Sequence, residues 1–353
     1  MIQPPRLRRI VVVLPNWVGD TLFATPLLRA LRAAHPGAYL ATLGMPLSLD
    51  VLAGNPHVDA MLVYDERGAH RSLRAKAALV RRLRAQHFDT AFILRRSFSR
   101  TLLLVLSGIP TRIGYDEGRG RRLLTHRVPL LQEPVHRAES YLRLARAVGI
   151  AAPVHRCDFV VGIDRQQQAD RWLASQRPAG DARPLVALNA GGNWPHKRWP
   201  EERFAQLAQR LQRELDTVVL LTGGPRDTAL AKRIAAGVVP APLIAAGTDS
   251  LQDAGALLAR CALVVSNDSG PLHIAAALGV PLVALFGPTS PSLTGPFGRG
   301  PWTIIHHADG CPQVPCYAPD EPSHPGMAAI SVEEVFAAVR QRLRGARTPV
   351  AHD

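Results

Sequence analysis

Three short segments of the chain carry residue types that could move a proton or bind an anionic ligand, and each directly follows an apolar run. The first is LPNWVGD (14–20), in which Asp20 stands at or near the start of an expected helix. A carboxylate there could cap the helix by accepting hydrogen bonds from its free N–H groups. It could also act as a general base that takes a proton from an incoming group. The residues alone leave both roles open.

The second segment is NAGGNWPHKRWP (189–200), whose candidate ligand-binding residues are Asn189, Gly191, Gly192, Asn193 and Lys197. Only three of the chain's 42 basic residues are lysines, so a lysine inside such a loop stands out. Small residues let the backbone approach a ligand, and the compact charge of Lys197 suits a phosphate or diphosphate. The spacing matches neither GxxxxGK[ST] nor GxGxxG. The alternative is an ordinary strand–helix loop with a solvated Lys-Arg pair.

The third segment, SNDSGPLH (266–273), opens a helical pattern. The N–H groups of Ser269 and Gly270 would point out of the helix N-terminus, where an anion is favoured. Asp268 could accept hydrogen bonds from sugar hydroxyls. His273, about one turn later, would either face the same ligand or be a satisfied, partly buried histidine.

The elements that must position these segments alternate between short apolar runs and helical patterns, which predicts βαβ units and parallel sheets. The expected strands are 10–14, 39–43, 61–64, 90–94, 185–188, 218–221, 262–265 and 280–286. The expected helices are 21–34, 47–53, 72–86, 201–215, 227–236, 251–260, 271–278 and 332–344. We therefore expect an α/β fold with two doubly wound, Rossmann-like domains that face each other across a cleft. In such sheets ligands bind outside the carboxyl ends of the strands.

A polar stretch that ends in RPAGDARP is the best candidate for a domain boundary. The expected organisation is a first domain at 1–163, a linker at 164–183, a second domain at 184–330, and a C-terminal helix and tail at 331–353.

The charge of the chain is unevenly distributed. The formal net charge is +14, of which residues 1–176 carry +13 and residues 177–353 carry +1. This asymmetry indicates that the first half meets nucleic acid, a membrane surface or a phosphorylated small molecule. The arginines of 71–84 fit a solvated helix face equally well. Those between 112 and 127 lie in a glycine-rich stretch, which suits the capture of anions.

Several classes of protein are disfavoured. No run approaches the roughly 18 apolar residues that span a bilayer, and no secretory signal is present, so we expect a soluble, cytoplasmic protein. The four cysteines are too sparse for a disulfide scaffold. The pair Cys311 and Cys316, near His306, His307 and His324, is spaced outside the strong zinc pattern, and we expect no metal. Aromatic residues are only 5% of the chain and form no RNA-binding platform.

Four segments resemble those of glycosyltransferase family 9, the heptosyltransferases of bacterial lipopolysaccharide assembly, and favour its heptosyltransferase II branch. They are residues 15–36, 95–124, 189–200 and 266–291, and the likeness covers most of 10–345 in order. The resemblance implies a GT-B fold and a metal-independent, inverting transfer without a cofactor. The donor would be ADP-L-glycero-D-manno-heptose, and the acceptor would be the lipopolysaccharide inner core at the inner face of the cytoplasmic membrane.

The resemblance also implies roles for individual residues. Asp20 matches the general base, and Lys197 matches the lysine near the donor phosphates. Donor binding is expected from Asp268, Ser269, Gly270 and His273 and from the earlier loop residues Asn189, Gly191, Gly192, Asn193, Gly223, Gly224 and Asp227. The loop 222–227 lacks the acidic residue that some relatives place soon after the glycines to hold the ribose, and Asp227 is the nearest substitute. The expected acceptor-binding residues are Asn16, Trp17, Arg96, Arg112, Arg119, Arg121 and Arg122.

Two alternatives remain. One keeps the fold and changes the sugar or the nucleotide of the donor. The other is a non-catalytic protein that binds anions or nucleic acid through the basic half, although no helix-turn-helix signature supports it. Duplex binding with a steep salt dependence and no turnover of nucleotide sugars would favour the second alternative.

Overall fold

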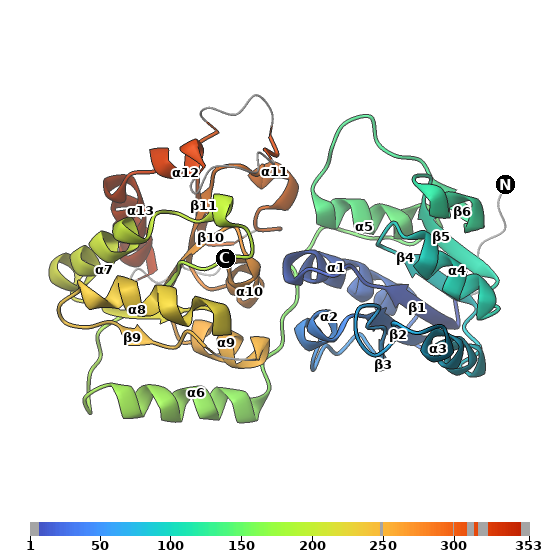
Figure 1. Ribbon diagram of the computed structural model, residues 1–353, viewed down its shortest axis with the longest axis horizontal. Helices are drawn as coiled ribbons and strands as arrows, with labels where there is room; N and C mark the ends of the chain where they lie inside the picture. Colours follow the sequence, from blue (N-terminus) through green and yellow to red (C-terminus); the bar gives the residue numbers. More distant parts are fainter. Residues whose placement is uncertain (1–6, 248–249, 299, 309–313, 317–323, 347–353) are drawn as a thin grey trace, which may run out of the picture. The chain divides into compact units, whose positions relative to one another are not determined.

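Each half of the chain folds around its own parallel six-stranded sheet (Figure 1). The computed structural model describes residues 7–247, 250–298, 300–308, 314–316 and 324–346. The chain divides into two units, Met1–Val160 and Val161–Asp353. Within each unit helices cover both faces of the sheet, as the alternation of apolar runs and helical patterns predicts. The expected α/β fold of two Rossmann-like domains is confirmed.

The sheet of the first unit has the strand order β3-β2-β1-β4-β5-β6. Its strands are β1 (Arg9–Val13), β2 (Tyr39–Gly44), β3 (Ala60–Val63), β4 (Thr90–Ile93), β5 (Thr111–Tyr115) and β6 (His126–Val128). Its helices are α1 (Val18–Ala34), α2 (Pro46–Val51), α3 (Leu73–Ala85), α4 (Phe98–Leu106), the 3₁₀ helix η1 (Arg119–Leu123) and α5 (Arg137–Arg146).

The second unit has the strand order β12-β11-β10-β7-β8-β9. Read from its other edge, this is the order of the first unit, with β7 in the place of β1 and β10 in the place of β4. Its strands are β7 (Leu185–Asn189), β8 (Val218–Thr222), β9 (Leu243–Ile244), β10 (Leu263–Asn267), β11 (Leu282–Phe286) and β12 (Trp302–His306). Its helices are α6 (Ile163–Gln176), η2 (Pro195–Lys197), α7 (Glu201–Leu215), η3 (Pro225–Asp227), α8 (Thr228–Ala236), α9 (Leu251–Leu258), α10 (Gly270–Leu278), α11 (Pro291–Thr294), α12 (Pro325–Ala329) and α13 (Val332–Ala346).

In both sheets the direction of winding reverses between the first strand and the fourth. These switch points lie between β1 and β4 in the first unit and between β7 and β10 in the second. Loops on the two sides of a switch point diverge, which opens a crevice at the carboxyl ends of the strands. The three segments singled out in the sequence follow β1, β7 and β10, and all of them therefore lie at a switch point.

The strands that the sequence pattern did not predict are edge or near-edge strands. The first unit adds β5 (TRIGY) and β6 (HRV), and the second adds the two-residue β9 and β12 (WTIIH). The central strands β1 and β4 are buried almost throughout and therefore contain continuous apolar runs. Edge strands are partly exposed, so polar residues hide the strand signal in β6 and β12, whereas β9 is too short to give one.

The second unit begins at Val161 and includes the segment 164–183, for which the sequence predicts a linker. Most of α6 lies in this segment, and two ion pairs attach the helix to the rest of the second unit. Arg260 Nε lies 2.7 Å from Asp170 Oδ1, and Arg165 Nη1 lies 2.9 Å from Asp253 Oδ1. These partners are distant in sequence and cannot be read from the polar pattern of the segment.

The C-terminal helix α13 packs into the core of the second unit. Val335, Phe336 and Val339 are buried in the same hydrophobic core as Trp199 and Phe204. Among the described residues, no helix combines the length and the apolar character needed to cross a membrane.

Candidate functional site

A buried carboxylate, Asp268, lies at the centre of the polar cluster in the second unit. Asp268 follows β10, Lys197 ends η2, and Thr289 follows β11. Lys197 Nζ lies 2.6 Å from Asp268 Oδ2, and Thr289 Oγ1 donates to the same oxygen at 2.7 Å. His273 Nε2, from the first turn of α10, lies 3.5 Å from Asp268 Oδ1. Three side chains, from η2, from the loop after β11 and from α10, therefore converge on one carboxylate.

Asp268 is ionised although it is buried. Its side chain is only 5% exposed, and burial alone would raise its pKa. The hydrogen bond from His273 and the charge of Lys197 outweigh burial and lower the pKa of Asp268 to about 2. The ionised carboxylate holds the Lys197 ammonium group at one place on the edge of the sheet, and the ring of Trp194 packs 5.2 Å from that group.

The N-terminus of α10 lies beside this cluster. Ser269 is the N-cap residue, its backbone is extended, and its side chain makes no capping hydrogen bond. The hydroxyl of Ser269 instead accepts from Asn189 Nδ2 at 2.9 Å, and Asn189 Nδ2 also donates to Ser266 Oγ at 3.1 Å. The strand ends of β7 and β10 are thereby joined. The positive end of the α10 dipole adds to the charge of Lys197.

The loops after β7 and β8 pack against each other through Asp227. A Cβ atom built on Gly191 would lie 2.4 Å from the Asp227 carboxyl group, and one built on Gly223 would lie 2.7 Å from Asp227 Cβ. Asp227 Oδ2 accepts a hydrogen bond from the Gly224 N–H group at 3.0 Å. The structure thus brings these four expected donor-binding residues together, while Asn193 is exposed in the same loop as Gly191.

Sequence reasoning missed the residue that holds the β7–α7 loop in place. Asn267, at the end of β10, donates from Nδ2 to the Ala190 carbonyl at 2.9 Å and accepts from the Trp199 N–H group at 3.1 Å. Trp199 is buried, and its Nε1 donates to the Ile330 carbonyl at 2.9 Å. A buried asparagine at the end of an apolar strand is the signal that could have identified it, because such a group needs partners.

In the first unit, Asp20 lies in the first turn of α1, since that helix begins at Val18 rather than at residue 21. Trp17, which is 57% exposed, is the N-cap residue and makes no side-chain capping bond. The Asp20 carboxylate is partly exposed, and Arg137 Nε at the start of α5 lies 3.6 Å from its Oδ1. Burial, together with the nearby charge of Asp20, raises the pKa of Tyr141.

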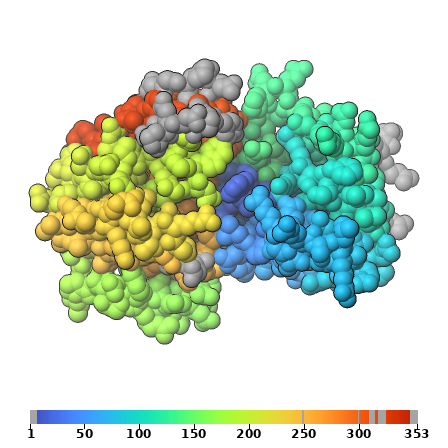
Figure 2. All heavy atoms as spheres, viewed as in Figure 1, coloured from blue at the N-terminus to red at the C-terminus, as the bar shows by residue number. Residues whose placement is uncertain are grey.

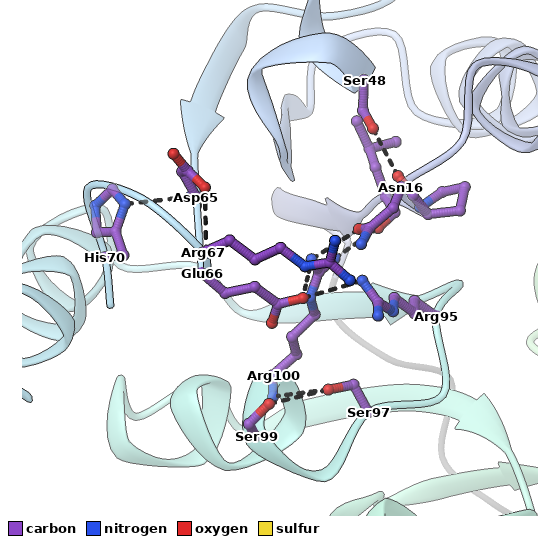
Figure 3. Close-up of polar contacts among 12 residues, drawn as sticks. Asn16, Ser48, Asp65, Glu66, Arg67, His70, Arg95, Ser97, Ser99 and Arg100 are labelled. Carbon is purple, nitrogen blue, oxygen red and sulfur yellow. Dashed lines mark hydrogen bonds and ion pairs between the residues drawn. The ribbon is translucent and has the colours of Figure 1, made fainter. Parts of the chain in front are cut away.

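A second polar network, absent from the sequence-based expectations, surrounds Glu66 (Figure 3). Arg100 Nη2 donates to Asn16 Oδ1 at 2.8 Å and lies 3.2 Å from Glu66 Oε1. Arg95 Nη1 lies 3.0 Å from the same Glu66 oxygen. Burial alone would raise the pKa of Glu66, but the charge and hydrogen bond of Arg100 lower it, with smaller contributions from Arg95 and Asn16. The side-chain amide of Asn16, an expected acceptor-binding residue, is therefore bonded to Arg100 and Glu66 of the same unit.

The expected acceptor-binding arginines fall into two groups. Arg96 is exposed and forms an ion pair with Glu117. Three more exposed arginines lie on η1, next to the start of α4: Arg119, Arg121 and Arg122. Arg112 differs, because its guanidinium donates to main-chain carbonyls, among them that of Leu123 at 2.7 Å. The Arg112 side chain thus holds the β5–β6 connection.

Within the described parts of the chain, no group of three or more His, Cys, Asp or Glu side chains could hold a metal ion. Cys311 lies outside the described residues. His307 Nε2 lies 3.1 Å from a carboxylate oxygen of Glu334. Burial raises the pKa of Cys157 and of Cys261 to about 12, so neither thiol is a nucleophile at neutral pH.

The chain is similar to proteins of one glycosyltransferase family. A family model described as glycosyltransferase family 9 (heptosyltransferase) matches residues 76–314. Lipopolysaccharide heptosyltransferase 2 of Escherichia coli K12 is 30% identical over 301 residues, which cover 82% of this chain and 86% of that protein. The crystal structure of a family 9 glycosyl transferase from Veillonella parvula superposes with a TM-score of 0.85 at 26% identity and covers 97% of this chain and 99% of its own. The ADP-heptose lipopolysaccharide heptosyltransferase II of Escherichia coli superposes with a TM-score of 0.81 at 27% identity, covering 96% and 100%.

The packing of Asp227 against glycine leads to a prediction about stability. Gly191→Ala should lower the urea midpoint of the second unit, because its methyl group would lie 2.4 Å from the Asp227 carboxyl group. Asp227→Ala should restore part of that loss in the double variant, with a coupling of about 1 kcal/mol or more. The control is Gly237→Ala, whose Cβ would have nothing within 4 Å. Additive effects of the two substitutions would contradict the described packing.

Proposed function

The chain belongs to glycosyltransferase family 9, and from that premise we propose that it transfers heptose from ADP-heptose to the lipopolysaccharide inner core. The resemblance to heptosyltransferase 2 proteins over most of the chain supports this substrate pair. The observation that carries the proposal at the level of chemistry is the Asp268–Lys197 ion pair beside the N-terminus of α10. This arrangement provides a fixed positive charge where a diphosphate leaving group would need one.

The donor half of the reaction falls to the second unit. As the bond between the heptose C1 atom and the diphosphate oxygen breaks, negative charge grows on the departing ADP. Lys197 and the N–H groups at the start of α10 stabilise that charge without a metal ion. Because Asp268 already holds the ammonium group in place, little reorganisation accompanies bond cleavage. Asp227 and its glycine neighbours bind the nucleoside part of the donor.

The acceptor half falls to the first unit. An acceptor hydroxyl oxygen forms the new bond to C1 on the face opposite to the leaving diphosphate, and its proton passes to the Asp20 carboxylate. The outcome is inversion at C1, with ADP as the second product. The acceptor carries carboxylates and phosphates, which suit Arg96, Arg119, Arg121 and Arg122. Trp17 offers an exposed ring for a sugar face, whereas Asn16 and Arg112 are left out of the proposed contact set because their side chains are engaged internally.

The first unit also carries a candidate membrane contact. The connection between β6 and α5, residues 129–136, runs as a long loop in Figure 1, and the segment around it protrudes in Figure 2. Leu130 and Leu131 in this loop are 44% and 42% exposed. Two exposed leucines in a half of the chain with a net charge of +13 suit peripheral contact with anionic lipid at the inner face of the cytoplasmic membrane.

The direct test of the substrate pair is a transfer assay. Purified protein, ADP-heptose and a monoheptosylated core acceptor should yield an acceptor whose mass has increased by one heptose residue. UDP-sugars and other ADP-sugars, offered in parallel, test the second candidate, a different nucleotide sugar. That candidate is motivated by the loop 222–227, which lacks the acidic residue that some relatives use to hold the ribose. Turnover of one of these sugars but not of ADP-heptose would replace the proposed donor.

The roles of the two catalytic groups predict different kinetic defects. Asp20→Asn should retain ADP-heptose binding while kcat falls by about 10²–10⁴. Lys197→Ala should weaken both donor binding and kcat, because it removes charge that both the bound donor and the transition state use. The matched control is Lys232→Ala, since Lys232 is an exposed lysine of the same unit. Near-normal turnover by Asp20→Asn would remove Asp20 from the role of base.

The membrane contact predicts a loss of lipid binding that leaves catalysis intact. Replacing Leu130 and Leu131 with aspartate should abolish sedimentation with phosphatidylglycerol vesicles, since it removes the apolar anchor and adds negative charge. Turnover of a detergent-free, truncated acceptor should be unchanged. If the wild-type protein and the double variant sediment equally with the vesicles at physiological salt, Leu130 and Leu131 do not form the membrane contact.

A further inference from the structure

We propose that Arg100 and Glu66 are positioning residues, which fix the β1–α1 loop and through it the first turn of α1 that carries Asp20. This inference rests on the function proposed above and adds to it two residues outside the expected site. Neither residue is assumed to touch a substrate. Their role is to fix the direction of the Asp20 side chain through bonds that reach the loop from other parts of the unit.

The β1–α1 loop lacks the usual local means of fixing a helix start. Trp17, at the N-cap position, has no side-chain oxygen and makes no side-chain capping bond. Thr21 Oγ1 donates to the Trp17 carbonyl at 2.9 Å, and further bonds to the loop come from elsewhere in the unit. Ser48 Oγ, in α2, donates to the Pro15 carbonyl at 2.7 Å, and Arg100 Nη1 donates to the Leu14 carbonyl at 2.9 Å.

Arg100 holds the loop at two points. Its two terminal nitrogens hold the Leu14 carbonyl and Asn16 Oδ1 at the same time, at 2.9 and 2.8 Å. The planar, forked guanidinium fixes the separation and direction of two acceptors, which a lysine ammonium group cannot do in the same way. Asp20 follows Asn16 by four residues, so a shift of the loop would be transmitted directly to the first turn of α1.

Glu66 keeps Arg100 in this orientation. The Arg100 side chain is 1% exposed, and its charge is balanced by Glu66 Oε1 at 3.2 Å, while the Tyr64 ring packs 5.4 Å from the guanidinium carbon. Arg95 and the Asn16 amide also bind Glu66 (Figure 3). Three loops, those after β1, β3 and β4, are thereby locked together.

The cost of this arrangement argues for a role in geometry rather than in stability alone. Burying an ion pair costs several kcal/mol of desolvation, and apolar replacements of similar volume are often as stable or more stable. A buried arginine at a switch point, bonded to the loop before a catalytic carboxylate, supplies what an apolar side chain cannot, namely directed hydrogen bonds. Misplacing a catalytic group by about 1 Å can lower a rate about 100-fold.

The first test is a kinetic cycle. Arg100→Lys should lower kcat per ADP-heptose binding site by about 10- to 100-fold, with the KM and Kd for ADP-heptose changed less than about twofold. In an Asp20→Asn background the same substitution should have little further effect, because Arg100 acts through Asp20. A decrease by the same factor in both backgrounds would overturn the proposal. Glu66→Gln, which keeps the shape and loses the charge, should show the same pattern with a smaller decrease, and it replaces Arg100→Lys if that variant fails to fold.

The second test does not depend on activity. Hydrogen exchange of the peptide that covers residues 14–24 should become faster in Arg100→Lys. The matched control is Arg9→Met, at the other end of the same strand. Arg9 Nε donates to the Gln86 carbonyl at 2.6 Å, and its guanidinium lies 4.3 Å from the Tyr39 ring. Arg9→Met should lower stability but leave both kcat per binding site and exchange in 14–24 unchanged. Unchanged exchange in Arg100→Lys would overturn the proposal, whereas a wild-type protein that makes no product from ADP-heptose would overturn only the proposed function.

Discussion

The geometry of the second unit depends on one carboxylate that stays ionised inside the protein. Burying the charge of Asp268 removes its hydration, and only close partners compensate for that loss. Those partners are Lys197, Thr289 and His273, which come from separate segments at the edge of the sheet. Moving any one of these segments would leave the charge of Asp268 less well compensated. The buried charge therefore fixes the positions of the loops around it. The result is an ammonium group held at a defined place before a ligand arrives.

The first unit has a buried charge of the opposite sign near its own switch point. Asp268 directly follows β10, and Arg100 lies in the first turn of α4, the helix after β4; β10 and β4 are each the fourth strand of their unit. One unit buries an anion against Lys197, and the other buries a cation against Glu66. This difference fits the proposed division of labour. The unit with the fixed Lys197 charge handles the leaving diphosphate, and the unit with the braced β1–α1 loop presents a carboxylate base.

Much of the fold could be predicted because parallel strands buried on both faces must be apolar. The strands β1, β4, β7 and β10 are such runs, and their positions locate the switch points. The prediction was less successful at the margins. The edge strands β6 and β9 are short and only partly buried, and α6 has few buried residues, so its polar sequence suggested a linker. Its attachment to the second unit relies on ion pairs with residues nearly 90 positions away.

By itself, the sequence determined which residue types stand after each central strand, since apolar runs and glycine-containing loops are local patterns. Asp20, Lys197, Asp268 and Ser269 were recognisable for that reason. Only the tertiary structure decided what each of them touches. Lys197 and Asp268 are 71 residues apart and meet because β7 and β10 are neighbours in the sheet. The order of the strands also decides that Arg100 is buried and that the Asn16 amide is bonded to it. Burial and side-chain pairing depend on neighbours in space, which no local sequence pattern specifies.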